Sequence, residues 1–192
     1  EMSASLVGSE MCIRDRLTIV LKKEIYMARK CFFSFHYTPD NWRVSQVRNI
    51  GAIEGNKPAK DNDWETVVGG GDKKIKEWIS EQMEGRICTV ILAGTNTADR
   101  KWINHEIVES WNRGMGVVAI HIHGLKNKDG EQSAKGKNPL SYITHGPTGK
   151  KLSDIAKCYD PPYSVSTNVY NYIAENIDSW IEEAIKIRKE NK

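Results

Sequence analysis

Short, nearly uninterrupted apolar runs alternate along this chain with stretches in which apolar residues recur every three or four positions. A continuous apolar run is typical of a strand that is buried on both faces, whereas the longer period is typical of a helix with one buried face. The runs that predict strands are 30–37, 87–92 and 116–123, with a shorter one at 155–159.

The stretches between the first runs carry helix signals. Thr38 is a candidate N-cap with Pro39 at the first helical position, so we expect a helix that continues toward Asn49. A second helix is expected from an N-cap at Asp72 to a stop at Gly85. Its buried stripe consists of Ile75, Trp78, Ile79 and Met83.

Two more helices are expected in the second half of the chain. Thr97 and Asp99 are candidate N-caps for a helix that ends at Gly114. Its buried stripe is Ile103, Ile107 and Trp111. The final helix, about 167–188, has a stripe wide enough to pack on a sheet: Val169, Tyr172, Ile173, Ile177, Trp180, Ile181 and Ile185.

Strands with two apolar faces that alternate with helices predict an α/β fold of flavodoxin-like size. We expect a parallel sheet of about four to five strands with helices on both faces. The stretch 51–71 is rich in Gly, Asn, Lys and Asp, and predicts a loop with at most a short strand at 64–68. A polar, aperiodic stretch at about 124–151 predicts a long surface insertion.

Composition narrows the class of protein. The 192 residues suffice for one domain, and 39% hydrophobic with 28% charged residues is typical of a soluble globular protein. The net charge of +3 is spread along the chain and does not predict a nucleic-acid groove. No run approaches the roughly 18 apolar residues that cross a bilayer, so we expect no membrane association. The four cysteines form no CxxC pair, which favours a reducing cytoplasm and two buried thiols, Cys31 and Cys88.

Residues 1–26 do not fit the pattern of the rest of the chain. Residues 5–16 have no clear period and resemble a translated sequencing adapter, and 22–27 can be back-translated into a ribosome-binding site before an ATG. We therefore expect 1–26 to be extraneous upstream sequence and 27–192 to be a single domain that starts at Met27. The alternative is an additional N-terminal strand at 17–26.

Glu106 is the strongest candidate for chemistry. It follows the strand 87–92 and a polar loop, and lies one helical turn after Trp102 on the same helix face. Its carboxylate is therefore expected just past the carboxyl end of a strand, where open α/β sheets bind ligands. The alternative is an ordinary solvated glutamate.

The residues that other flavodoxin-sized proteins use for their chemistry are missing from this sequence. The strand ends carry no receiver-type acidic residues, and no phosphate-binding glycine loop or nucleophile elbow is present. His121 and His123 alternate on one strand and suggest a metal pair, but no third ligand is evident, so hydrogen-bonding histidines are the alternative and we predict no metal site. His105 is expected about 100° around the helix from Glu106, in a structural or exposed position.

The order of several motifs resembles one family. Residues 32–37, Arg48 with Asn49, 92–97, and Trp102 with Glu106 are similar to the TIR-like proteins of the Thoeris anti-phage system, and 116–122 and 135–139 continue the match. The resemblance covers most of 27–145. TIR enzymes place a catalytic glutamate four residues after a tryptophan, as Glu106 follows Trp102 here.

The resemblance implies cleavage of NAD at the nicotinamide–ribose bond, with Glu106 as the catalytic residue. NAD is then the substrate and no further cofactor is expected. Phe35, His36 and Tyr37 are expected to stack on a base or to bond a phosphate, with core packing as the alternative. Arg48 is a candidate for the pyrophosphate, or else a solvated helix-end arginine.

The sequence does not decide which product forms, and two alternative functions remain. Capture by water gives ADP-ribose, and capture within the nucleotide gives a cyclic ADP-ribose-type signal that an effector protein would receive. The first rival is a non-catalytic TIR-like module that self-associates and recruits a partner. The second is another nucleoside-processing enzyme, such as a deoxyribosyltransferase, which also uses a glutamate near a strand end.

Overall fold

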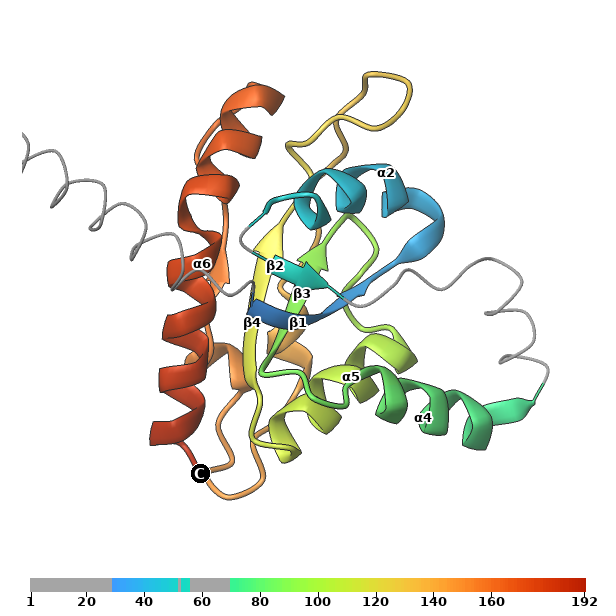
Figure 1. The fold of residues 1–192 in the computed structure, drawn as a ribbon, viewed down its shortest axis with the longest axis vertical. Helices are drawn as coiled ribbons and strands as arrows, with labels where there is room; N and C mark the ends of the chain where they lie inside the picture. Colours follow the sequence, from blue (N-terminus) through green and yellow to red (C-terminus); the bar gives the residue numbers. More distant parts are fainter. Residues whose placement is uncertain (1–28, 52, 56–69) are drawn as a thin grey trace, which may run out of the picture.

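The computed structural model describes residues 29–51, 53–55 and 70–192. Their centre is one sheet in which all neighbouring strands are parallel, in the order β2-β1-β3-β4-β5 (Figure 1). The strands are β1 Arg29–Phe35, β2 Ile53–Gly55, β3 Cys88–Ala93, β4 Gly116–His121 and β5 Cys158–Tyr159. The expected α/β fold with a parallel sheet is confirmed.

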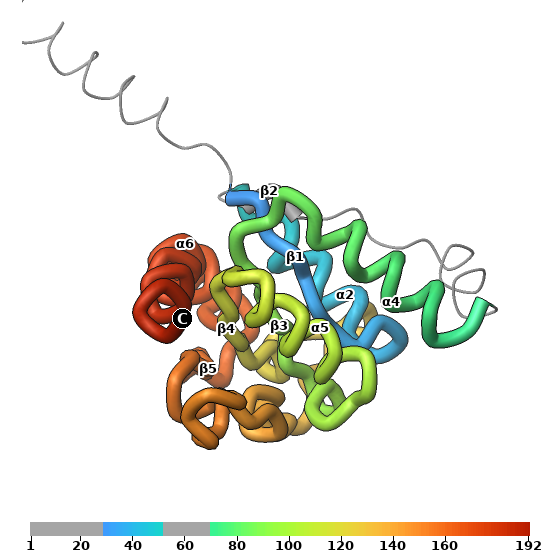
Figure 2. Tube along the Cα trace, turned by 90° about the horizontal axis from the view of Figure 1, so that it is seen from below, coloured from blue at the N-terminus to red at the C-terminus, as the bar shows by residue number. Residues whose placement is uncertain are grey.

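Helices cover both faces of the sheet. They are α2 Tyr37–Arg48, α4 Gly71–Gln82, α5 Lys101–Asn112 and α6 Ser166–Glu190. Along β3, Val90 and Leu92 pack in the core beneath α2 and α6, whereas Ile91 packs against α5. Figure 2 accordingly shows α6 and α5 on opposite sides of β4. No helix in the described residues is long and apolar enough to cross a membrane.

The central strands are apolar on both faces because both are covered. All six residues of β3 and all six of β4 are buried, which explains the continuous apolar runs in the sequence. Cys31 and Cys88 are fully buried and opposite one another in the β1–β3 register, so their prediction as buried thiols is confirmed.

The helix starts differ from the sequence prediction. The N-cap residues are His36, Gly70 and Arg100, not Thr38, Asp72 and Thr97 or Asp99, and none of the three makes a side-chain cap hydrogen bond. The reason is clear before α5, because the Thr97 hydroxyl accepts a hydrogen bond from Gly94 N–H at 2.9 Å and so closes the loop instead. Asp99 has a positive φ of 60° within the same loop.

The stretch 124–151 is not the purely superficial insertion that the sequence predicts. It contains the 3-10 helix η1 Pro139–Tyr142 and is followed by η2 Leu152–Asp154. Leu140 and Ile143 pack with Leu152 into the core beneath α5. Two apolar residues three positions apart in a polar stretch are too few to predict this packing from the sequence. The expected strand at 64–68 and the segment 1–26 lie outside the described residues.

Candidate active site

The site lies at the carboxyl edge of the sheet, between β1 and α5. Side chains alternate along β1, so Phe33 and Phe35 pack toward the core beneath α2 and α6, and Ser34 faces the opposite side. There the Ser34 hydroxyl donates a 2.6 Å hydrogen bond to Oε2 of Glu106. Glu106 therefore lies against the end of a strand, as the sequence predicts for its position.

The surroundings of Glu106 alter its acidity. The side chain is half-buried, and burial raises its pKa to about 7, while the hydrogen bond from Ser34 acts in the opposite direction. A carboxyl with this pKa populates both its neutral and its charged form near neutral pH. The charged form would meet a cationic substrate in a partly desolvated place, where electrostatic attraction is stronger than in water.

The helix that carries Glu106 is held rigidly. Ile103 and Ile107 are buried beneath it, and the Ser110 hydroxyl donates 2.6 Å to the Glu106 carbonyl and lies 2.6 Å from the Thr89 hydroxyl of β3. These contacts connect the turn around Glu106 to the sheet. The position of the carboxylate is therefore set by a rigid element, as a catalytic group requires.

Trp102 packs between α5 and α4. It is half-buried against the cluster formed by Phe32 and the buried residues of α4, and the Lys101 ammonium lies 4.8 Å from its ring centroid. His105 contacts the Trp102 ring edge-on at 5.9 Å. Trp102 therefore fixes the first turns of α5 against α4.

The three residues that end the first predicted strand have different surroundings. Phe35 packs partly into the core, which agrees with the alternative of core packing for this residue. Tyr37 is 39% exposed and opens α2. His36 is half-buried; burial and the nearby Arg100 lower its pKa, and its Nδ1 has no hydrogen-bond partner. Of the three, His36 has a buried polar atom that a ligand could satisfy.

Arg48 is not brought to Glu106. It lies in the last turn of α2, which runs back from the carboxyl edge, and its guanidinium is 5.6 Å from the Phe33 ring centroid. Burial and the neighbouring Arg86 lower its pKa. Since Arg86 donates to the Cys31 carbonyl in the first half of β1, Arg48 belongs to the amino-terminal side of the sheet.

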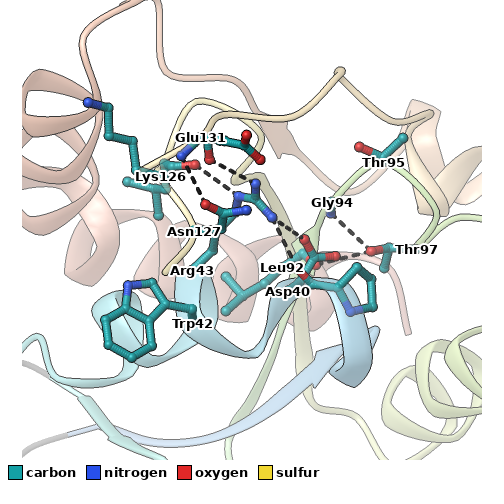
Figure 3. Close-up of polar contacts among 12 residues, drawn as sticks. Asp40, Trp42, Arg43, Leu92, Gly94, Thr95, Thr97, Lys126, Asn127 and Glu131 are labelled. Atoms are coloured by element: carbon teal, nitrogen blue, oxygen red, sulfur yellow. Dashed lines mark hydrogen bonds and ion pairs between the residues drawn. The ribbon is translucent and has the colours of Figure 1, made fainter. Parts of the chain in front are cut away.

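Sequence reasoning missed a buried ion pair beside the site. Asp40 and Arg43 lie 3.3 Å apart on α2, with only 2% and 5% of their side chains exposed (Figure 3). A signal was present, because Asp40, Arg43, Val44 and Val47 follow the i, i+3, i+4, i+7 spacing of a buried helix face. Charged residues at such positions indicate a partner, but not which one.

His121 and His123 do not form a metal centre in this structure. Their rings are 5.9 Å apart, and His123 Nδ1 lies 3.9 Å from Asp160, which also pairs with Lys135 at 2.7 Å. Within the described ranges, no group of three or more His, Cys, Asp or Glu side chains is arranged to hold a metal ion.

Two comparisons with known proteins found sequences similar to this chain. Residues 32–127 match the family model of the Thoeris protein ThsB, TIR-like domain. A protein of Bacillus cereus (strain MSX-D12) named "Putative cyclic ADP-D-ribose synthase ThsB1" is 33% identical over 133 residues, which cover 66% of this chain and 69% of the relative. The region that matches the family model includes the second half of β1, all of β3 and α5, and both Ser34 and Glu106.

Proposed function

This chain belongs to the Thoeris ThsB family of TIR-like proteins, and we propose from this that it cleaves NAD to produce a cyclic ADP-ribose-type signal in anti-phage defence. The name of the Bacillus cereus relative, a cyclic ADP-D-ribose synthase, supports the reaction class. The observation that carries the proposal is the Ser34–Glu106 hydrogen bond at the carboxyl edge of the sheet.

A single carboxylate suffices for the bond cleavage. Nicotinamide leaves from a cationic pyridinium with the electron pair of the C–N bond, so it departs as a neutral molecule and requires no general acid. The ribose carbon that it leaves acquires oxocarbenium character. We propose that the Glu106 carboxylate stabilises this positive charge, which is greatest in the transition state.

Ser34 has a supporting role in this proposal. Its hydroxyl donates to Glu106 Oε2, which fixes one oxygen and leaves the second for the substrate. A hydrogen bond to a carboxylate favours the charged form, so Ser34 lowers the pKa that burial raises. Ser34 therefore increases the fraction of Glu106 that is ready to stabilise a cation at neutral pH.

The second step decides the product. A cyclic product forms when a nucleophilic oxygen or nitrogen of the same nucleotide, rather than water, bonds to the ribose carbon and then loses its proton. The product would act on an effector protein as a diffusible ligand. Under this proposal NAD is the substrate, no separate cofactor is required, and self-association of the chain would be one means of activation.

The test is incubation of the purified chain with NAD, with and without a phage-derived trigger or a crowding agent, followed by chromatography of the products. We expect nicotinamide release together with a cyclic nucleotide. Glu106→Gln should lower the rate roughly 100-fold or more, because the carboxamide has no charge. Glu109→Gln is the matched control, since this residue lies on the same helix and pairs with Arg113 at the surface.

Each outcome has a definite reading. Equal release by the parent chain and Glu106→Gln would remove Glu106 from catalysis. No release under any trigger would favour the non-catalytic assembly module. Transfer of deoxyribose between bases, tested with deoxynucleosides in the same assay, would favour the deoxyribosyltransferase alternative.

A further inference from the structure

The loop between β3 and α5 and the segment that follows β4 lie at the carboxyl edge beside the proposed NAD site, and Arg43 joins α2 to that segment. Its Nε donates 2.9 Å to the Leu125 carbonyl, and its Nη2 donates 3.1 Å to the Glu131 carbonyl. Its Nη1 donates to Asp40 Oδ1 and to the Pro39 carbonyl. Figure 3 shows this guanidinium between α2 and the segment that follows β4. One side chain thus fixes both ends of the turn between 125 and 131.

Asp40 extends the junction to the loop between β3 and α5. A Cβ added to Gly94 would lie 2.0 Å from Asp40 Oδ2, so the carboxylate occupies the space above this glycine. Asp40 is 2% exposed and its Oδ2 has no hydrogen-bond partner. Only glycine at position 94 leaves room for the buried carboxylate.

The segment that Arg43 holds also lies directly on the β3–α5 loop. A Cβ added to Gly136 would be 2.0 Å from the Gly94 carbonyl oxygen, and the Thr95 hydroxyl donates 2.6 Å to the Ala134 carbonyl. At its other side, Lys135 pairs with Asp160. Residues 131–136, which we name the edge segment, therefore rest on the loop that leads into α5 and Glu106.

We infer that the edge segment forms one wall of the NAD site and that Asp40 and Arg43 are the positioning residues that hold it there; this inference rests on the proposed function. The wall is built from the backbone and side chains of this segment, and the cationic Lys137 that follows it has a charge that complements the pyrophosphate of a dinucleotide. Arg43 acts through the segment and does not itself touch the substrate.

The position of the wall determines binding more than bond cleavage. The Ser34–Glu106 contact uses none of the hydrogen bonds of Arg43. Displacement of the edge segment should therefore raise KM for NAD and leave kcat nearly unchanged, which is the signature of lost uniform binding. Loss of Glu106 should instead lower kcat and leave KM for NAD nearly unchanged.

The first experiment changes the contact between Gly136 and the Gly94 carbonyl and leaves the Asp40–Arg43 ion pair in place. Gly136→Ala forces the edge segment away from the Gly94 carbonyl, and we expect KM for NAD to rise about tenfold or more, with kcat within about threefold of the parent. Gly146→Ala is the matched control, because a Cβ there meets no atom within 4 Å. It should behave as the parent does.

The second experiment changes the ion pair. Arg43→Lys keeps the charge but not the planar fork that reaches two carbonyl groups, and should also raise KM. The double variant Asp40→Asn with Arg43→Met removes both charges, so that no buried charge is left alone if Arg43→Lys folds poorly. The thermal unfolding midpoint of each variant is measured, and kinetics are recorded well below that temperature. If the ion pair only stabilised the fold, KM and kcat would be unchanged under these conditions.

The outcomes separate the two proposals. Parent-like KM in Gly136→Ala and in a folded ion-pair variant would overturn the inference while the proposed function stands. A fall in kcat with an unchanged KM would also overturn it, since the segment would then act on the chemical step. Absence of NAD cleavage in the parent chain would overturn both.

Discussion

Ser34 and Glu106 are joined by a 2.6 Å hydrogen bond although they lie 72 positions apart in the sequence. The bond connects β1, which lies between β2 and β3 in the sheet, to the helix that carries the proposed catalytic group. Burial raises the pKa of Glu106 and the hydrogen bond from Ser34 lowers it, and together they leave the pKa at about 7. The pH dependence of the reaction therefore reports on this pair.

The rate of NAD cleavage should rise with pH through about 7, because the proposed active form of Glu106 is the carboxylate. Ser34→Ala removes a donor that favours this form, so the midpoint of kcat/KM should move to higher pH. The measurement is kcat/KM for NAD from pH 5.5 to 9. Ser45→Ala, which removes an exposed hydroxyl on α2, is the control. A shift in the opposite direction would contradict the assignment.

Glu106→Gln should stabilise the fold at alkaline pH. The folded pKa is raised from 4.5 to about 7, so the contribution of Glu106 to stability is fully present below pH 4.5 and is lost as pH rises through 7. The neutral amide avoids this loss, which amounts to about 3 kcal/mol at pH 8. Urea unfolding at pH 5 and pH 8 measures it. The gain should shrink toward pH 5, and Glu109→Gln should show no comparable gain.

Arg43→Met should destabilise the fold by about 3–5 kcal/mol, because it leaves the Asp40 carboxyl buried without its partner. Removing both charges together should cost less than the single change. Chemical unfolding of the single and double variants gives the difference. Lys73→Met, which breaks an exposed pair with Glu77, is the control and should change stability by less than about 1 kcal/mol. A loss of similar size in both would refute the special role of burial.

Gly116→Ala should separate α6 from β4. An added Cβ would lie 2.8 Å from the Ile185 backbone nitrogen, and backbone of a packed helix cannot yield as a flexible side chain does. We expect a loss of about 1–3 kcal/mol and a lower melting temperature. Gly51→Ala, where a Cβ meets no atom within 4 Å, should be nearly neutral. An unchanged melting temperature for Gly116→Ala would contradict this packing.

Much of the fold was predictable because burial on both faces leaves a direct trace in the sequence. The runs that became β1, β3 and β4 are nearly uninterrupted in their apolar residues, and the stripes of α4, α5 and α6 have helical spacing. The helix starts were not predictable in the same way. Thr97 is a good N-cap by residue type, but its hydroxyl is used by Gly94 in the folded loop.

The site was predictable in part. Glu106 could be placed near a strand end, and this is where it lies. Its partner could not be identified, because which strand adjoins α5 depends on the order β2-β1-β3-β4-β5. A faint signal existed in Ser34, the single hydroxyl among the aromatic residues 32–35. The end of the helix at which Arg48 lies was also not predictable as part of the site, since Arg48 is in the last turn of α2, away from Glu106.

The place of β1 beside β3 has a consequence for how the site is assembled. Strands β3 and β4 and the helix between them form a continuous unit from Cys88 to His121, which can form from local contacts. Bringing Ser34 to Glu106 closes a loop of 72 residues, at an entropic cost of about 4 kcal/mol before other contacts compensate. We therefore expect the helix that carries the carboxylate to form early, and its surroundings to be completed when the first strand joins the sheet.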